Sequence, residues 1–289
     1  MTASNLRSIK RAFVTGATGF IGGFLVRDLA AKGWEVHALA RQKPTNQETL
    51  RACVWHLYDG TYESVEEAIA LSRADVVFHL ASVFLAEHRP SEIDLLVNAN
   101  LRLGMQLLEA MHQHRVNGLV NTGTSWQHLK DSAYDPVNLY AATKQAFEAI
   151  IDYYCNAHGL AAITLKLYDT YGPHDIRRKL IPYLEKSLRD GTPLDMTEGL
   201  QEISLVHVED IVRAFGISVK LLSSANHLRF GLPARSPLTI REVVEKLTQN
   251  MPKEPKVTWG TRQKAKRQPD SPAVIDKLPD WQPLRSFPD

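Results

Sequence analysis

A glycine-rich turn near the N-terminus constrains the fold of this chain more than any other feature. The segment TGATGFIG, residues 15–22, follows a short apolar strand predicted at 12–15 and opens a helix predicted at 20–31. Glycines at 16, 19 and 22 let the backbone turn tightly and approach a phosphate, and a helix N-terminus offers free N–H groups and a positive dipole end. This order indicates a dinucleotide site. The residues predicted to hold the cofactor there are Gly16, Thr18, Gly19, Phe20 and Ile21.

Strands and helices are predicted to alternate through the first 170 residues. Later strands are predicted at 34–40, 54–57, 75–80, 118–122 and 163–167, and helices at 64–72, 91–116 and 138–158. Such alternation implies βαβ units and a parallel sheet, and continuous apolar runs within its strands fit burial on both faces. We therefore predict an α/β fold of the Rossmann type, with a doubly wound parallel sheet.

The regular alternation weakens after about residue 170, where prolines become frequent. We predict a cofactor-binding Rossmann domain over residues 1–170 and a smaller C-terminal substrate-binding lobe over 171–289, with some crossing of the chain between them. Cofactor and substrate are expected to meet at the carboxyl ends of the strands.

Composition and charge exclude several kinds of partner. The net charge is +2, and no long basic run follows a helix, so no nucleic-acid partner is expected. No stretch approaches the roughly 18 apolar residues that span a bilayer, so no membrane partner is expected. Cys53 and Cys155 match no metal spacing, so they are interpreted as reduced packing thiols of a cytoplasmic protein, and no metal site is predicted.

A tyrosine and a lysine four residues apart supply the candidate chemistry. Tyr140 and Lys144 fall in the helix predicted at 138–158, and this spacing places both side chains on one helix face. A phenol is a poor proton donor at its reference pKa of roughly 10, but a neighbouring ammonium lowers that pKa. Tyr140 is therefore predicted to exchange a proton with a carbonyl or alcohol oxygen during hydride transfer.

The end of the second predicted strand favours NADP over NAD. NAD sites usually place an acid there to bind the ribose hydroxyl, whereas this strand ends in Arg41, and the first acid after it is Glu48. A guanidinium binds a 2′-phosphate with paired hydrogen bonds. The alternative is that Arg41 is a surface residue that at most stacks on adenine.

Several motifs together resemble one enzyme family. TGATGFIG at 15–22, HLAS at 79–82, Tyr140 with Lys144, and YGP at 171–173 are similar to the extended short-chain dehydrogenase/reductases, the NAD-dependent epimerase/dehydratase family of sugar-nucleotide epimerases, dehydratases and reductases. This resemblance implies an NAD(P)-dependent oxidoreductase acting on a nucleotide sugar. It also implies a homodimer built from the long helices predicted at 91–116 and 138–158.

The resemblance also implies roles for matching residues. Lys144 would bind the nicotinamide ribose as well as assisting Tyr140, and a threonine after the fifth strand would complete the catalytic set. Thr122 is the better match for that residue, and Thr124 is the runner-up. The alternative for either is a turn hydroxyl bonded to backbone. The remaining implied cofactor contacts are Asp59 at adenine, Leu80, Ala81 and Ser82 at the nicotinamide ribose, and Asn100 as a support of the active site.

Two departures from the family pattern bear on the reaction. The 4,6-dehydratases carry Asp-Glu directly after the threonine, where this chain has Gly123-Thr124, so elimination of water is not expected. The Arg-Asp-Phe that often precedes the His-Val pair is replaced by Ile203-Ser204-Leu205. Arg267 stands where another diphosphate-binding arginine is common in the family. The resemblance therefore implies Arg267 as a substrate-binding residue, together with Thr124.

More narrowly, residues 121–128 and 136–140 resemble the CDP-abequose and CDP-paratose synthase type of 4-ketoreductase. The resemblance implies NADPH-dependent reduction of the 4-keto group of a CDP-3,6-dideoxyhexulose in O-antigen biosynthesis. Two alternatives remain open at the level of the sequence. One is an epimerase that retains NAD, and the other is a non-catalytic NADP-sensing module. The sugar configuration, the nucleotide base and the product stereochemistry are not encoded in any motif.

Overall fold

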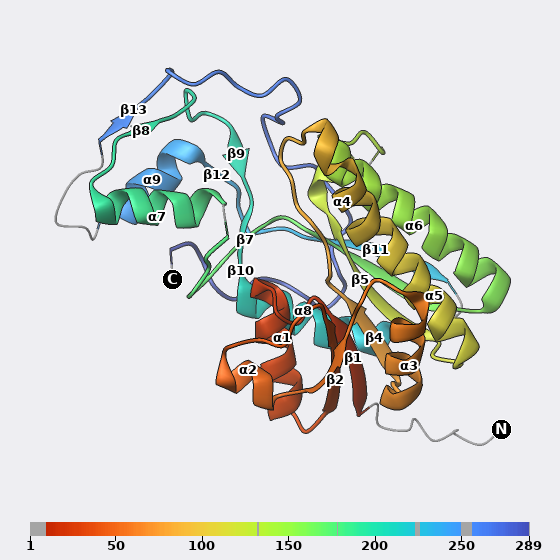
Figure 1. The fold of residues 1–289 in the computed structure, drawn as a ribbon. Coiled ribbons are helices and arrows are strands. Elements are labelled where there is room, and N and C mark those ends of the chain that lie inside the picture. The colour runs from red at the N-terminus through yellow and green to blue at the C-terminus, as the bar shows by residue number, and fades with distance from the viewer. Residues whose placement is uncertain (1–9, 132, 178, 223–225, 250–255, 289) are drawn as a thin grey trace. The chain divides into compact units, whose positions relative to one another are not determined.

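The computed structural model describes residues 10–131, 133–177, 179–222, 226–249 and 256–288 (Figure 1). The strands are β1 (Arg11–Thr15), β2 (Glu35–Ala40), β3 (Val54–Leu57), β4 (Val76–His79), β5 (Gly118–Thr124), β6 (Ala161–Leu167), β7 (Asp169–Tyr171), β8 (Leu194–Asp195), β9 (Glu202–Ile203), β10 (Leu205–His207), β11 (His227–Leu232), β12 (Leu238–Thr239) and β13 (Val257–Thr258). The helices are α1 (Phe20–Ala31), α2 (Gln47–Arg51), α3 (Tyr62–Ser72), η1 (Pro90–Glu92), α4 (Ile93–Val97), η2 (Asn98–Arg102), α5 (Leu103–Gln113), η3 (Ser125–Gln127), α6 (Leu139–His158), α7 (Leu180–Asp190), α8 (Val208–Leu221) and α9 (Ile240–Thr248).

Seven strands form the central sheet, in the order β11-β6-β5-β4-β1-β2-β3. The pairings of β1 with β2 and β4, of β2 with β3, and of β4 with β5 are all parallel. The order reverses at β1, with β2 on one side and β4 on the other, which is the switch point of a doubly wound sheet. The predicted α/β Rossmann fold is therefore confirmed.

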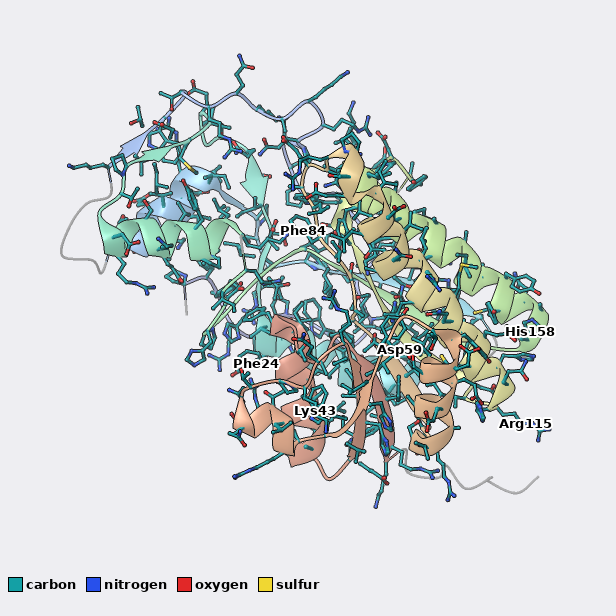
Figure 2. The ribbon with its side chains drawn as sticks, in the orientation of Figure 1. Phe24, Lys43, Asp59, Phe84, Arg115 and His158 are labelled. Atoms are coloured by element: carbon teal, nitrogen blue, oxygen red, sulfur yellow. The ribbon has the colours of Figure 1, made fainter. Side chains whose placement is uncertain are left out.

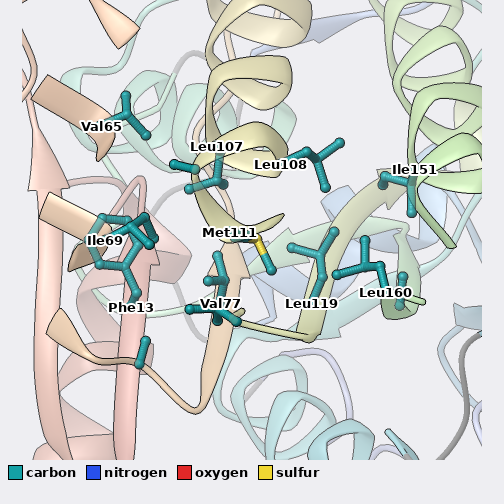
Figure 3. Close-up of a cluster of buried hydrophobic side chains, with 14 of the residues drawn as sticks. Phe13, Val65, Ile69, Val77, Leu107, Leu108, Met111, Leu119, Ile151 and Leu160 are labelled. Atoms are coloured by element: carbon teal, nitrogen blue, oxygen red, sulfur yellow. The ribbon is translucent and has the colours of Figure 1, made fainter. Parts of the chain in front are cut away.

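Apolar residues at alternate strand positions hold helices against the sheet. Phe13, Val77 and Leu119 pack with residues of α3, α5 and α6 in one buried cluster (Figure 3). Neighbouring strand residues point to the opposite face of the sheet because side chains alternate along a strand. On that face the ring of Phe78 packs edge-on against the ring of Phe215 of α8, with the ring centroids 5.9 Å apart. Both faces are thus covered, as the apolar runs in the strands predicted.

The helix predicted at 91–116 is interrupted. A π-helical turn, η2, separates α4 from α5, so the sequence pattern predicted the extent of the helix but not this irregularity. α5 then packs closely on α6 (Figure 1). A Cβ at Gly104 would fall 2.3 Å from the ring of Phe147, so glycine is required for this close approach.

Contacts divide the chain into two compact units. The first unit contains Met1–Thr122, Thr143–Thr164 and Phe215–Leu228, and the second contains Gly123–Ala142, Leu165–Ala214 and Arg229–Asp289. Several elements therefore begin in one unit and end in the other, namely strands β5, β6 and β11 and helices α6 and α8.

The second unit has its own core, where Leu184 of α7, Leu205 of β10 and Val243 of α9 pack together.

Within the described ranges, no helix is long and apolar enough to cross a membrane.

Candidate active site

The glycine turn after β1 is built so closely that side chains are excluded from it. Gly16 has φ +75°, and a Cβ there would lie 2.6 Å from the amide nitrogen of Ala81. A Cβ at Gly22 would lie 2.1 Å from the carbonyl oxygen of Gly16. Gly19 precedes α1 without a side-chain cap, and the first turn of α1 carries no acid. The N-terminus of α1 therefore keeps its positive dipole end for an anion.

A cavity of about 440 Å³ opens beside this turn, within the first unit. It lies at the carboxyl ends of β1, β2, β3 and β4, beside the helix run from α4 to α5. Its lining residues are Gly16, Thr18, Gly19, Leu39, Ala40, Arg41, Tyr58, Gly60, Leu80, Ala81, Ser82, Val83, Leu95, Asn98, Ala99, Arg102 and Leu103. A cradle that Cβ atoms would fill, next to an uncapped helix end, fits the pyrophosphate of a dinucleotide.

The charged residues that line this cavity are basic. Arg41 and Arg102 both contribute to it, and no Asp or Glu is among its described lining residues. Asp59, predicted at adenine, lies on the loop from β3 into α3 (Figure 2). Its carboxylate accepts hydrogen bonds from the Thr61 amide at 2.8 Å and the Thr61 hydroxyl at 2.6 Å, and these bonds lower the pKa of Asp59. Its neighbours Tyr58 and Gly60 line the cavity instead.

Asn100, predicted to support the active site, is bonded to residues in one wall of the cavity. Its side-chain oxygen accepts from the Val83 amide at 2.8 Å and the Ser82 hydroxyl at 3.1 Å. Its amide nitrogen donates to the Val83 carbonyl and to the Thr143 hydroxyl. The side chain is buried, so these bonds fasten the segment after β4 to both η2 and α6.

Lys144 is buried at the carboxyl end of β5, with 3% of the residue exposed. Its ammonium donates to the carbonyl oxygen of Thr122 at 2.9 Å, and the Thr122 hydroxyl donates to the carbonyl of His79 at 3.0 Å. Burial lowers the pKa of Lys144 to about 8, and the charge of Glu148 opposes that shift. Burial lowers the pKa of His79 to about 3, assisted by the charge of Lys144, so this imidazole is neutral beside the lysine.

Tyr140 occupies the first turn of α6, one turn ahead of Lys144, and is half-buried. The helix begins there because the side-chain oxygen of Asn138 accepts from the Ala141 amide at 2.9 Å, which is the bond of an N-cap. Residues four apart on a helix share a face, so the phenol and the ammonium lie along one side of α6. The predicted pair is thus carried by one rigid element.

The two candidate threonines make different bonds. The hydroxyl proton of Thr122 is used at the His79 carbonyl. The hydroxyl of Thr124 accepts from the Trp126 amide at 3.3 Å and caps η3, which leaves its own proton for another acceptor. Neither Gly123-Thr124 nor Ser125-Trp126 contains an acid, so no Asp-Glu pair follows either threonine.

Arg267 lies on the second unit, beside the segment that leads into α6. Its Nε donates to the Pro136 carbonyl at 2.9 Å, and its guanidinium forms an ion pair with Asp135. The residues that follow it, Gln268 and Pro269, line a cavity of about 70 Å³. The other lining residues of that cavity are Ser125, Trp126, His128, Tyr168, Asp169, Gln201, Glu202, Ile203, Ser204, Pro272 and Ala273.

Comparison with known proteins identifies the family of this chain. The family model described as NAD dependent epimerase/dehydratase family matches residues 12–227, from β1 to the start of β11. The chain belongs to this family. The resemblance seen in the sequence is therefore confirmed, and the family assignment makes the chain an NAD(P)-dependent enzyme.

Two curated relatives within the epimerase/dehydratase family illustrate its range. A CDP-abequose synthase of Salmonella typhimurium is 31% identical over 204 residues, covering 70% of this chain and 67% of that protein. A UDP-glucose 4-epimerase of Corynebacterium glutamicum is 24% identical over 258 residues, covering 81% of this chain and 78% of that protein.

Solved structures share the epimerase/dehydratase fold. The UDP-glucuronic acid 4-epimerase of Bacillus cereus, in complex with UDP-glucuronic acid and NAD, has a TM-score of 0.84 at 19% identity, covering 95% of this chain and 94% of that chain. The UDP-glucose 4-epimerase of Thermus thermophilus, in complex with NAD, has a TM-score of 0.80 at 24% identity. The match covers 96% of this chain and 95% of that chain. These likenesses concern the fold.

The structure brings most predicted cofactor residues to one cavity of this family member and adds others. Phe20 and Ile21 belong to the first turn of α1, where the Phe20 ring packs edge-on against Phe24. Arg102 and Tyr58 were missed in the sequence because no motif marks them.

Proposed function

We propose that this protein is an NADPH-dependent reductase of the 4-keto group of a nucleotide-diphosphate deoxysugar, with a CDP-4-keto-3,6-dideoxyhexose as the substrate. The observation that carries the cofactor part is the cavity lining, which contains two arginines and, in its described residues, no carboxylate. The sugar part is supported by the relative named CDP-abequose synthase.

Different residues of the chain bind the cofactor and transfer the proton in the proposed reaction. The turn at Gly16 and the N-terminus of α1 would hold the pyrophosphate, and Arg41 would bind the 2′-phosphate. When bound, NADPH supplies the hydride for the keto carbon. Tyr140 donates the proton that the keto oxygen needs, and the ammonium of Lys144, fixed by the Thr122 carbonyl, stabilises the phenolate left behind.

The residues that follow the two candidate threonines support reduction over elimination. Loss of water from a hexose needs an acid and a base near the sugar, and the residues after either candidate threonine supply none. A threonine hydroxyl and the Tyr140 phenol can both donate to a keto oxygen, and such donors stabilise the negative charge that develops there. The same two donors are of little use for removing a proton from carbon.

Mass spectrometry of the product tests the proposal. The protein is incubated with NADPH and a panel of 4-keto CDP-, dTDP-, GDP- and UDP-deoxysugars, and NADPH absorbance is followed. We expect stoichiometric NADPH oxidation and a product heavier by two hydrogens, with the CDP sugar preferred. A product lighter by one water from an unmodified nucleotide hexose would contradict the proposal.

The epimerase alternative is separated by the cofactor that the purified protein carries. A dissociable NADPH reductase should lose its nicotinamide during purification. Tightly retained NAD, together with interconversion of 4-hydroxy sugar nucleotides without net oxidation, would instead establish an epimerase. A protein that binds NADPH but turns over no sugar on the panel would support the sensing module.

A further inference from the structure

We propose that Arg102 is a second specificity residue of the cofactor cavity and binds the 2′-phosphate of NADP together with Arg41. This inference rests on the proposed NADPH dependence. It adds a residue from the helix side of the cavity to the one at the strand end.

Arg102 is presented to the cavity by one face of the helical run from α4 through η2 to α5. Leu95, Asn98, Ala99, Arg102 and Leu103 all line the cavity, and their spacing of three and four residues is that of one helix face. Arg102 ends the π-helical turn η2. Turns of this kind are frequent at functional sites.

The contacts of Gln106 place this part of the helix beside the loop after β3. Gln106 follows Arg102 by one turn, so the two share a helix face. Its side-chain oxygen accepts from the Tyr58 hydroxyl at 2.8 Å, and its amide donates to the Gly60 carbonyl at 3.2 Å. These bonds join the helix to the loop after β3, which follows the strand next to β2.

Tyr58 links this helix to Arg41. The Tyr58 amide donates to the carbonyl of Ala40 at 2.9 Å, and Ala40 immediately precedes Arg41. Burial raises the pKa of the Tyr58 phenol, and the nearby charge of Arg102 acts in the opposite direction. Arg102 therefore lies near Tyr58, and Arg41 follows the β2 residue to which the Tyr58 backbone is bonded.

The charge balance at this end of the cavity favours a dianion. Arg41 and Arg102 are exposed, and neither forms an ion pair with a described carboxylate. Asp59, the nearest acid in the sequence to Tyr58, is turned to Thr61. Two guanidinium groups without a neutralising acid suit a phosphate monoester, which accepts paired hydrogen bonds from each.

Calorimetric titration of the full-length protein with 2′,5′-ADP and with 5′-ADP tests this inference. The two probes differ only in the 2′-phosphate. We expect Arg102→Ala to weaken 2′,5′-ADP by about 10- to 100-fold, the range of hydrogen bonds to charged groups, and to change 5′-ADP by less than about threefold. Arg41→Ala should behave in the same way. Arg51→Ala, an exposed arginine of α2 outside the cavity, is the matched control and should change neither.

The outcomes separate this inference from the proposed cofactor preference. If the unmodified protein binds both probes equally, NADPH preference fails and Arg102 loses its role with it. If only Arg41→Ala removes the preference for 2′,5′-ADP, NADPH dependence stands and the inference about Arg102 is overturned. Equal weakening of both probes by Arg102→Ala would assign that residue to the adenosine or the 5′-phosphate. Circular dichroism of each variant verifies folding.

Discussion

The ammonium of Lys144, on α6, is bonded to the main-chain carbonyl of Thr122, at the end of β5, across 2.9 Å. This bond fixes a buried positive charge at the carboxyl edge of the sheet. Because the acceptor is a backbone atom, its position does not depend on a side-chain rotamer. The charge is therefore held in place before any ligand binds, and one turn of helix separates it from Tyr140.

Reduction should lose rate on the alkaline side of pH 8. Burial lowers the pKa of Lys144 to about 8, so the charge that assists Tyr140 is present below that pH and disappears above it. We expect turnover to fall by up to about tenfold per pH unit above this value. Lys144→Met should be slow at all pH values and lack this limb. An unchanged alkaline limb in the variant would assign it to another group.

Removing the phenol of Tyr140 should remove most of the turnover. Tyr140→Phe is expected to bind NADPH normally and to lose at least about 10²-fold in turnover, the low end of general acid contributions. Tyr153→Phe, the same change at a residue of α6 that is 58% exposed, is the matched control and should keep its rate. Stopped-flow measurement of NADPH oxidation compares the two. Near-normal turnover in Tyr140→Phe would remove the role assigned to this residue.

Two adjacent glycines of α1 should respond in opposite ways to alanine. A Cβ at Gly22 would lie 2.1 Å from the Gly16 carbonyl oxygen, so Gly22→Ala must push the turn open, at a cost of about 1–3 kcal/mol and with loss of NADPH binding. At Gly23 the nearest atom, on Arg27, is 3.5 Å away, so Gly23→Ala should be neutral or stabilise the helix by up to about 1 kcal/mol. Thermal unfolding and NADPH fluorescence titration measure both effects. Similar stability in the two variants would mean that the turn is not closely packed.

Local patterns predicted the frame of the site, and tertiary contacts determined the rest. The glycine turn and the Tyr140/Lys144 pair were recognisable because their residues are close in sequence and their periods are regular. Arg102 was not recognisable, because its place in the cavity depends on the bonds of Gln106 to a loop more than forty residues away. The choice between Thr122 and Thr124 likewise depends on which hydroxyl the His79 carbonyl engages, and that carbonyl lies on another strand.

A homodimer through α5 and α6 is a further proposal, supported by exposed apolar side chains along this helix pair. Met105 of α5 is 49% exposed, and Tyr153 of α6 is 58% exposed. Met105→Glu is expected to shift the protein to about 32.5 kDa species in sedimentation experiments at micromolar concentration. Leu71→Glu, at an apolar residue of α3 that is 61% exposed, should leave the assembly unchanged. Monomers in the unmodified protein would contradict the dimer.

Substitution of each threonine at the end of β5 should show which one donates to the keto oxygen. Thr122→Val deprives the buried His79 carbonyl of its donor, so it should lower the free energy of unfolding by about 1–3 kcal/mol while turnover stays within about tenfold. Thr124→Val removes the hydroxyl whose proton is left for another acceptor, and the loss of one such donor costs about 10²–10³ in turnover. Thr124→Ser keeps the hydroxyl and the cap of η3, so it should restore the rate. The reverse pattern, with Thr122→Val inactive and fully stable, would make Thr122 the catalytic threonine and Thr124 a turn residue.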